Sequence, residues 1–342
     1  MKLRETIDTD SMEAGSDTEL SETQCNGSNR ALIFVLGSIF GTALTATLGL
    51  FLNKTSSRST HHHSSKLYSD PDQERRHSHA VSTHNKRVLN IDSVFRPKLL
   101  QSTVILITGA NRGLGLALTQ TAMKCGARVI ALCRSTSPEL TQLKPFQIIE
   151  NIDVQSDSSM ELLKSKLNQL KLKVDVVVNS AGYFSKQRES LIDHTMDFSD
   201  ELKTIDICAV GMLRVTYAML ECGAIRKGSK VVMITSQGGS VEWRDVQSQS
   251  GGDYGHHMSK AAANMMGKLC ANELKSMGIA VGVFHPGFNK TQMTKKYESI
   301  WEKEGAVDPM VGAKRVLHEI TCLDMETTGC FINCEDSLLI PW

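Results

Sequence analysis

The sequence lacks the cysteine patterns that are typical of disulfide-rich and zinc-binding proteins. Its nine cysteines include no CxxC pair and no Cys/His spacing suited to zinc, so neither a disulfide framework nor a metal site is expected, and a reduced compartment is favoured. It also lacks an excess of charge, because 38 Lys and Arg against 37 Asp and Glu leave a net charge of +1. General electrostatic attraction to nucleic acid is therefore not expected.

The N-terminal part is divided by an uncharged run. Residues 1–30 hold acids, Ser, Thr and Gly with few large apolar side chains, which predicts a disordered acidic tail. Residues 31–52, "ALIFVLGSIFGTALTATLGLFL", carry no charge and are long enough to cross a bilayer core of roughly 30 Å, so we predict a transmembrane helix. A signal peptide would begin with basic residues, and these follow an acidic tail. Gly37 and Gly41 form a GxxxG spacing, which leaves a homodimer possible.

Basic residues flank this span unequally. Arg30 precedes it, whereas Lys54, Arg58 and Lys66 follow it, so we expect the C-terminal bulk to lie in the cytosol, on an endomembrane such as the endoplasmic reticulum. Residues 53–99 are rich in Ser, His and Arg and include six of the eleven histidines. A metal-binding tract is the alternative there, but without acidic co-ligands a solvated, disordered linker is favoured.

From residue 100 onward, short apolar runs alternate with helix-length segments. The runs are "TVILITG", "ARVIALC", "FQIIENID", "VDVVVNSAG", "KVVMITS" and "IAVGVFHPG". Continuous apolar strands separated by helices are typical of a parallel sheet that helices cover on both faces. Residues 100–342 are therefore predicted to form a single α/β, doubly wound, Rossmann-like domain.

The first run leads directly into the glycine-rich turn "TGANRGLG", Thr108 to Gly115, and then into a helical pattern. Gly109, Gly113 and Gly115 allow the backbone to approach a pyrophosphate, while the free N–H groups of the new helix face its charge. A glycine triplet alone is weak evidence, but its place after a first strand supports a dinucleotide site.

These and later motifs resemble the short-chain dehydrogenase/reductase family, with a C-terminal tail, "FINCEDSLLIPW", similar to the C-factor-like subgroup. The supporting motifs are "NIDV", "NSAG" and "HPGFNKTQM", and the resemblance covers about residues 101–342. It implies a nicotinamide dinucleotide held by Gly109, Asn111, Arg112, Gly113, Leu114, Gly115, Arg134, Asp153, Val154, Asn179, Ala181, Gly182, Lys260, Pro286, Gly287 and Thr291.

The end of the second strand bears on which dinucleotide is bound. An acid at this strand tip would bind the ribose hydroxyls of NAD, but Cys133 and Arg134 stand there, with Arg112 in the glycine turn. Two basic side chains near the ribose suit a 2′-phosphate, so NADP(H) is the favoured cofactor. The alternative is that both arginines are solvated surface residues.

The resemblance also implies a catalytic serine, tyrosine, lysine and asparagine. Ser236 and Lys260 match the serine and the lysine, whereas His256 stands at the tyrosine's place and Cys208 at the asparagine's. Tyr254 is the nearby phenol, but two residues along a helix turn it by about 200° to another face.

Three interpretations of His256 remain open. It acts as the general acid, it lines the pocket without transferring a proton, or the helix begins in another register and Tyr254 is the acid. Histidine is the commonest acid–base residue, but Lys260 disfavours its charged form and its reach is shorter than that of a phenol. His257 is expected to be a bystander that faces solvent.

We therefore expect a membrane-anchored, NADP(H)-dependent short-chain reductase that acts on a small apolar carbonyl or alcohol. An apolar lid over the substrate is expected from Phe288, Met293, Tyr297, Ile300 and Trp301, unless these residues pack onto the core. A rival function is an NADP(H)-binding sensor or scaffold without turnover. In a third interpretation, the anchor and the linker serve to tether a structural domain to a membrane contact.

Overall fold

The computed structural model describes residues 67–185, 187, 189–247 and 251–342. The predicted acidic tail (1–30), transmembrane helix (31–52) and the first part of the linker (53–66) lie outside these residues. So does the GxxxG spacing on which a homodimer was considered. Among the described residues, no helix has both the length and the apolar character needed to cross a membrane.

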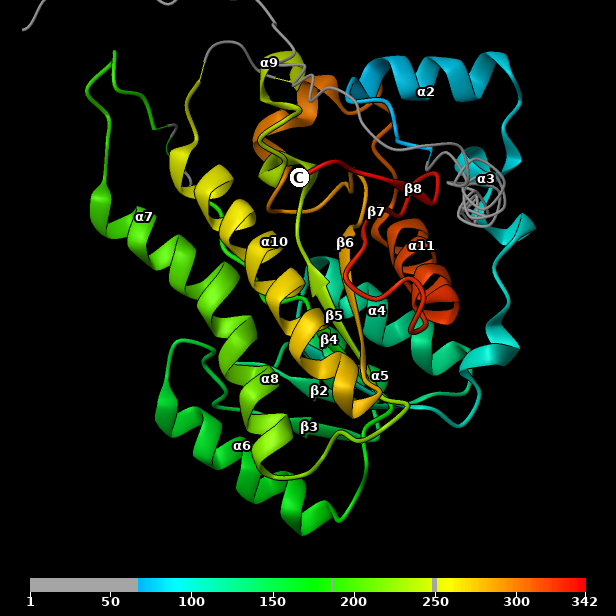
Figure 1. Ribbon diagram of the computed structural model, residues 1–342, viewed down its shortest axis with the longest axis vertical. Coiled ribbons are helices and arrows are strands. Elements are labelled where there is room, and N and C mark those ends of the chain that lie inside the picture. The colour runs from blue at the N-terminus through cyan, green and yellow to red at the C-terminus, as the bar shows by residue number, and fades with distance from the viewer. Residues whose placement is uncertain (1–66, 186, 188, 248–250) are drawn as a thin grey trace, which may run out of the picture. The chain divides into compact units, whose positions relative to one another are not determined.

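The described chain is built on one eight-stranded sheet in the order β3-β2-β1-β4-β5-β6-β7-β8 (Figure 1). The strands are β1 (Val104–Thr108), β2 (Arg128–Leu132), β3 (Gln147–Ile149), β4 (Val176–Asn179), β5 (Lys230–Ile234), β6 (Ala280–His285), β7 (Phe331–Asn333) and β8 (Leu338–Leu339). All neighbours are parallel except β7 and β8, which pair antiparallel. The first six strands coincide with the six apolar runs of the sequence, whereas β7 and β8 were not predicted.

Helices connect the strands and cover both faces of the sheet. The α-helices are α2 (Gln73–Ser82), α3 (Lys86–Leu89), α4 (Gly113–Lys124), α5 (Pro138–Leu143), α6 (Asp157–Leu170), α7 (Phe198–Ile205), α8 (Gly211–Glu221), α9 (Arg244–Gln247), α10 (Tyr254–Leu274) and α11 (Pro309–Cys322). The 3₁₀ turns are η1 (Ile91–Ser93), η2 (Pro97–Leu100), η4 (Gln237–Gly239), η5 (Lys275–Met277) and η6 (Lys295–Ile300), and η3 (Asp206–Val210) is a π-helical turn between α7 and α8.

Alternate residues of each strand supply two separate cores. On β1, Leu106 joins the core under α6, α8 and α10, whereas Ile105 and Ile107 join the core under α4 and α11. All three side chains are fully buried. Because successive side chains of a strand point to opposite faces, this division confirms the predicted doubly wound α/β architecture.

The strand order reverses at β1, which has β2 on one side and β4 on the other. The chain therefore leaves β1 and β4 toward opposite faces of the sheet at its carboxyl edge. Ligands of open α/β sheets bind at such a switch point. The glycine turn and the "NSAG" segment lie there.

The prediction of a disordered linker over residues 53–99 is wrong for residues 67–99. This segment forms α2, α3, η1 and η2 and lies beside β8 and α11 (Figure 1). Ser69 donates its backbone N–H to Leu339 and its hydroxyl to Asp336, so the segment is attached to the last strand.

A buried ionic cluster provides the main attachment of the segment. Arg76 of α2 pairs with Glu335 at 3.2 Å, and Arg315 of α11 pairs with the same carboxylate at 3.4 Å. Glu335 is buried, which by itself would raise its pKa, but the two guanidinium groups outweigh burial and lower the pKa to about 2. The sequence reads as a polar linker because these partners lie far away along the chain.

Candidate active site

The glycine turn after β1 is packed so closely that a side chain would not fit. A Cβ on Gly115 would lie 2.2 Å from the carbonyl oxygen of Gly109. Gly109 has a φ of +66°, and a Cβ there would lie 2.9 Å from Cα of Ala181, in the loop after β4. These contacts bring the two switch-point loops together just before α4, whose first three residues include Gly113 and Gly115.

Thr108 joins the same two loops by hydrogen bonds. Its buried hydroxyl accepts the backbone N–H of Ser180 at 3.0 Å and that of Ala181 at 2.9 Å. The neighbouring Asn179 is turned the other way, since its amide lies 3.4 Å from the hydroxyl of Thr216 in the core. The structure therefore gives Asn179 a core-packing position, although the family resemblance implies a cofactor contact.

The loop after β6 approaches the glycine turn from the other side. Methyl Cγ2 of Thr291 would lie 3.8 Å from a Cβ placed on Gly113. Gly287 has a φ of +82°, and a Cβ there would lie 2.7 Å from Glu335. The carboxylate of Glu335 accepts the N–H of Phe288 at 3.2 Å, so the ionic cluster supports this loop directly.

The end of β2 presents a charged pair. Arg134 is exposed, and its guanidinium lies 4.0 Å from the carboxylate of Asp153. Asn111 of the glycine turn donates to the carbonyl of Ser135 at 3.0 Å, which brings the two turns together. Arg112 is exposed beside them. Two cations thus face solvent at the position expected for the adenosine ribose, while Leu114 packs against the core and offers only its backbone.

Val154 and Cys208 are placed by the π-helical turn η3. Gly211 follows this turn, and a Cβ there would lie 2.7 Å from Val154. The thiol of Cys208 lies 3.3 Å from the N–H and 3.4 Å from the carbonyl of Tyr183, after the "NSAG" segment. Cys208 is fully buried, so it packs this loop onto the helix. π-helical turns are frequent at functional sites because they redirect a helix locally.

Ser236 and His256 both lie next to Gly238. A Cβ placed on Gly238 would lie 3.2 Å from Oγ of Ser236 and 3.2 Å from Nε2 of His256. Oγ of Ser236 accepts the N–H of Gly238 at 3.0 Å, which leaves its own proton available. Lys260 follows one turn after His256 and is only 8% exposed, with Nζ 3.4 Å from the carbonyl of Ile234. The serine, histidine and lysine are thus assembled at the carboxyl edge of β5.

His256 lies in an environment that disfavours a positive charge. Burial, and then the cations Lys260, Lys296 and Arg244 together with His257, hold its pKa well below the ordinary value. Its Nδ1 is buried with no hydrogen-bond partner among the described residues. The imidazole is therefore neutral at neutral pH, so it offers one N–H rather than an imidazolium.

Tyr254 and His257 have different surroundings from His256. Tyr254 is the first residue of α10, and its hydroxyl would lie 3.7 Å from a Cβ on Gly251, in the loop before the helix. The expectation that His257 faces solvent is wrong, because its Nδ1 lies 2.8 Å from the carbonyl of Gly238 and Arg244 contacts its ring at 3.0 Å. Burial is the main cause of its lowered pKa.

Aromatic side chains line one side of the site. The ring of Phe184 lies 4.4 Å from that of His256 and 6.3 Å from that of Tyr297. The hydroxyl of Tyr297 donates to Asp253 at 2.9 Å, and Cε of Met293 would lie 3.6 Å from a Cβ on Gly182. Tyr297 and Met293 of the expected lid thus approach the site.

The other expected lid residues are Phe288, Ile300 and Trp301. All three are half-buried, and Nε1 of Trp301 is buried with no partner among the described residues.

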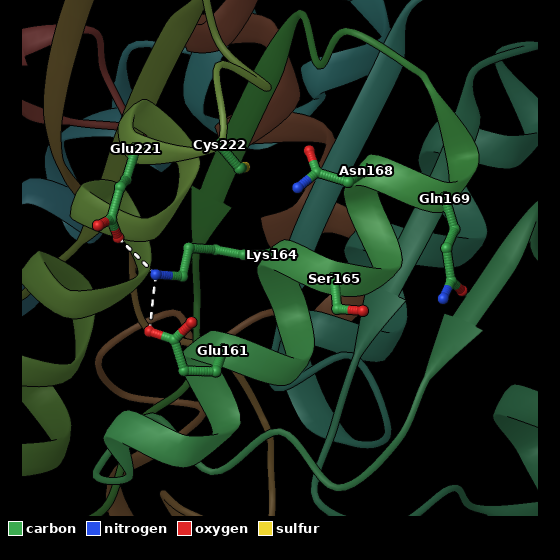
Figure 2. A pocket seen from close by; sticks show the side chains of 7 residues that line it. All are labelled: Glu161, Lys164, Ser165, Asn168, Gln169, Glu221 and Cys222. Carbon is green, nitrogen blue, oxygen red and sulfur yellow. Dashed lines mark hydrogen bonds and ion pairs between the residues drawn. The ribbon is translucent and has the colours of Figure 1, made fainter.

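A separate surface cavity of about 690 Å³ lies between α6 and the end of α8. Figure 2 shows Lys164 there between Glu161, at 2.7 Å, and Glu221, at 2.6 Å. The helices of a parallel α/β fold run opposite to the strands, so the end of α8 lies at the amino edge of the sheet. This cavity is therefore remote from the glycine turn and does not belong to the candidate site.

Several residues of the site were missed by the sequence patterns. Phe184 lies in a loop, and Gln237 and Arg244 begin helical turns of three and four residues, which are too short to show a periodic pattern. Their contacts join segments that the sequence patterns do not connect. Thr108 was visible as the first residue of the glycine motif, yet nothing local indicated its bonds to the "NSAG" loop.

The comparisons with known proteins match the part of the chain that forms the α/β domain. The model of the family described as short chain dehydrogenase matches residues 103–300. A 1-hydroxy-2-glutathionyl-2-methyl-3-butene dehydrogenase of Rhodococcus sp. (strain AD45) is 28% identical over 240 residues, which are 70% of this chain and 100% of the relative. C-signal of Myxococcus xanthus is 34% identical over 171 residues, 49% of this chain and 93% of the relative.

Solved structures show the same fold. An NADPH-bound carbonyl reductase from chicken fatty liver has a TM-score of 0.60 at 22% identity, and covers 71% of this chain and 100% of its own. The carbonyl reductase Sniffer of D. melanogaster has a TM-score of 0.59 at 20% identity, with the same coverage. The matched region contains the glycine turn, Ser236, His256 and Lys260, and excludes the attached segment 67–99.

Proposed function

Because this chain belongs to the short chain dehydrogenase family, we propose that it is an NADP(H)-dependent oxidoreductase that reduces the carbonyl group of a small apolar substrate. The observation that carries the proposal is the proximity of Ser236 Oγ and His256 Nε2, which both lie next to Gly238. A carbonyl group bound against these two side chains would have two donors beside it, at the edge of the sheet where the glycine turn lies.

The residues present fit a nicotinamide dinucleotide. A Cβ at Gly109 or Gly115 would collide with neighbouring backbone, so these positions form a turn that is open to a pyrophosphate. Buried Lys260 places its ammonium beside the end of β5, where it would hold the nicotinamide ribose. Arg134 and Arg112 would pair with a 2′-phosphate, which is why we propose NADP(H) rather than NAD(H).

When bound, the cofactor would supply the hydride. Ser236 would hold the carbonyl oxygen, and the N–H of His256 would donate to it as negative charge develops. A neutral imidazole serves as such an electrophile elsewhere among enzymes. The proton that completes the alcohol comes from His256 and is replaced from water, so a hydride and a proton are added to the carbonyl overall. Phe184, Tyr297 and Met293 would exclude water around an apolar substrate.

The membrane anchor is part of the proposal. Residues 31–52 would span the bilayer once, with residues 53–342 on the cytosolic side. Protease added to sealed microsomes should digest the catalytic domain, whereas its protection would place the domain in a lumen.

A second candidate is a non-catalytic NADP(H)-binding sensor or scaffold. It is favoured by the low pKa of His256, which makes the residue a poor source of protons, and by Cys208 at the place of the family's asparagine. Steady-state NADPH oxidation by the full-length protein with a panel of aldehydes and ketones separates the two. Turnover supports the reductase, and NADPH binding without turnover of any carbonyl supports the sensor.

A further inference from the structure

Arg244 is a cation beside His257, close to the candidate active site. It is the first residue of α9, between Ser236 and His256, and its guanidinium contacts Gln247 and the ring nitrogens of His257, the latter at 3.0 Å. Among the described residues, no Asp or Glu forms an ion pair with it. Its Nε is buried without a hydrogen-bond partner there.

Three other cations in this part of the molecule do have acidic partners. Arg76 and Arg315 share the carboxylate of Glu335, and Lys296 pairs with Asp253 at 3.2 Å. A half-buried charge without a counter-ion costs free energy that burial of apolar surface must offset. Arg244 is therefore a cation whose anionic partner would have to come from outside the described residues.

The position of Arg244 connects it to the reaction space. Its Nη1 contacts the ring of His257, whose Nδ1 would lie 3.1 Å from a Cβ on Gly238, the residue next to which Ser236 and His256 lie. One imidazole ring thus separates the guanidinium from that residue. Lys260, Lys296 and Arg244 all disfavour a positive charge on His256.

We infer that Arg244 binds a carboxylate on the carbonyl substrate, so that the preferred substrates are oxo acids with an apolar body. The planar guanidinium matches a carboxylate with two parallel hydrogen bonds. Phe184, Tyr297 and Met293 supply the apolar wall beside it. This inference rests on the proposed reductase function and names the substrate class of that same site.

The test compares aryl oxo acids with their methyl esters. Full-length protein would be assayed with NADPH and a series in which one to four methylene groups separate an aryl ketone from the carboxylate. At the best spacing, Arg244→Met should lower the ratio of kcat/KM for the acid to kcat/KM for the ester by about 10- to 100-fold, the worth of a charge-assisted contact. Any effect of the change on His256 applies to both substrates and cancels in this ratio. Arg244→Lys should recover part of the preference. Arg226→Met, which removes an exposed arginine elsewhere, should change neither value.

The outcomes separate this inference from the proposed function. An acid-to-ester ratio that is the same in the unaltered protein and in Arg244→Met, at every spacing, overturns the inference while the reductase stands. If no carbonyl is reduced, the reductase proposal fails, and binding of the oxo acids to the NADPH complex is measured by calorimetry. Weaker binding in Arg244→Met then still supports an anion site, whereas equal binding rejects it.

Discussion

The nucleotide edge and the catalytic cleft are built on different principles. At the nucleotide edge, function depends on backbone approach, and Gly109 and Gly115 are required because any Cβ would collide with neighbouring backbone. In the cleft, function depends on side chains that lie close together, and His256 occupies a family tyrosine's place there. Backbone packing restricts the nucleotide turn to glycine, whereas in the cleft the side chain of His256 packs against the ring of Phe184.

The two regions also differ in what supports them. The glycine turn is held by Thr108 and Ala181, both within the region that matches the family. The loop that carries Ser236 is contacted from outside that region, because Arg76 of α2 donates to Gln237 at 2.7 Å as well as to Glu335. The loop of Ser236 is thus contacted directly by a segment outside the family match, whereas the glycine turn is connected to that segment only through Glu335 and the loop after β6.

The largest effect is expected from changing the side chain at the centre of the cleft. His256→Ala should lower turnover by roughly 10² or more, since general acid catalysis contributes about 10² to 10⁴, while the NADPH dissociation constant stays the same. His256→Tyr should keep or raise activity, and Tyr254→Phe, the matched control, should do little. Steady-state kinetics and NADPH titration measure both quantities. Loss of turnover in Tyr254→Phe with a harmless His256→Ala would show that the acid is assigned to the wrong residue.

Replacing Arg76 is expected to disrupt the coupling between the cleft and α2, whereas replacing the adjacent Arg75 is not. Arg76→Ala should lower the free energy of unfolding by about 3 kcal/mol, because it leaves Glu335 buried with one counter-charge fewer. Arg75→Ala, which removes a solvent-exposed pair with Asp70, should change stability little. Urea unfolding can be followed by the fluorescence of Trp243, over whose ring Arg76 lies at 5.9 Å. Equal stability of the two variants would contradict a supporting role for the segment.

A smaller effect, confined to the nucleotide edge, is expected at the end of β2. Arg134→Asp should weaken NADPH binding by about 10- to 100-fold and spare or improve NADH, because the 2′-phosphate loses a cation and the ribose hydroxyls gain an acid. Arg128→Ala, at the other end of the same strand and stacked on Phe146, is the control. Dissociation constants for both dinucleotides test this, and equal affinities in the unaltered protein would rule out the NADP(H) preference.

A gradual loss of stability in acid is also expected, spread over several pH units. Burial lowers the pKa of His285 from 6.5 to about 3, so below pH 6.5 the unfolded chain binds a proton that the folded chain does not. The pKa of Glu335 is lowered from 4.5 to about 2 in the folded chain, so its stabilisation is present above pH 4.5 and is lost as the pH falls toward 2. Melting temperatures should therefore decline from pH 7 to pH 4. His285→Asn should flatten the decline and exposed His79→Ala should not.

Prediction from sequence was accurate where local patterns carry the information. The six main strands are continuous apolar runs, and the glycine turn is a contiguous motif, so both could be located. The strands β7 and β8, with three and two residues, are too short to produce a recognisable pattern. The helix α2 has a largely polar sequence, and its docking depends on Glu335, about 260 residues away, so a linker was predicted instead.

The order of residues along the chain was sufficient to indicate a parallel α/β domain, a dinucleotide turn and an unusual histidine at the acid's place, because each is encoded within a few neighbouring positions. The protonation of that histidine, the unpaired Arg244 beside it and the role of residues 67–99 depend on groups that meet across the sheet edge. Burial and electrostatic fields arise from all neighbours in space, and sequence spacing does not report them.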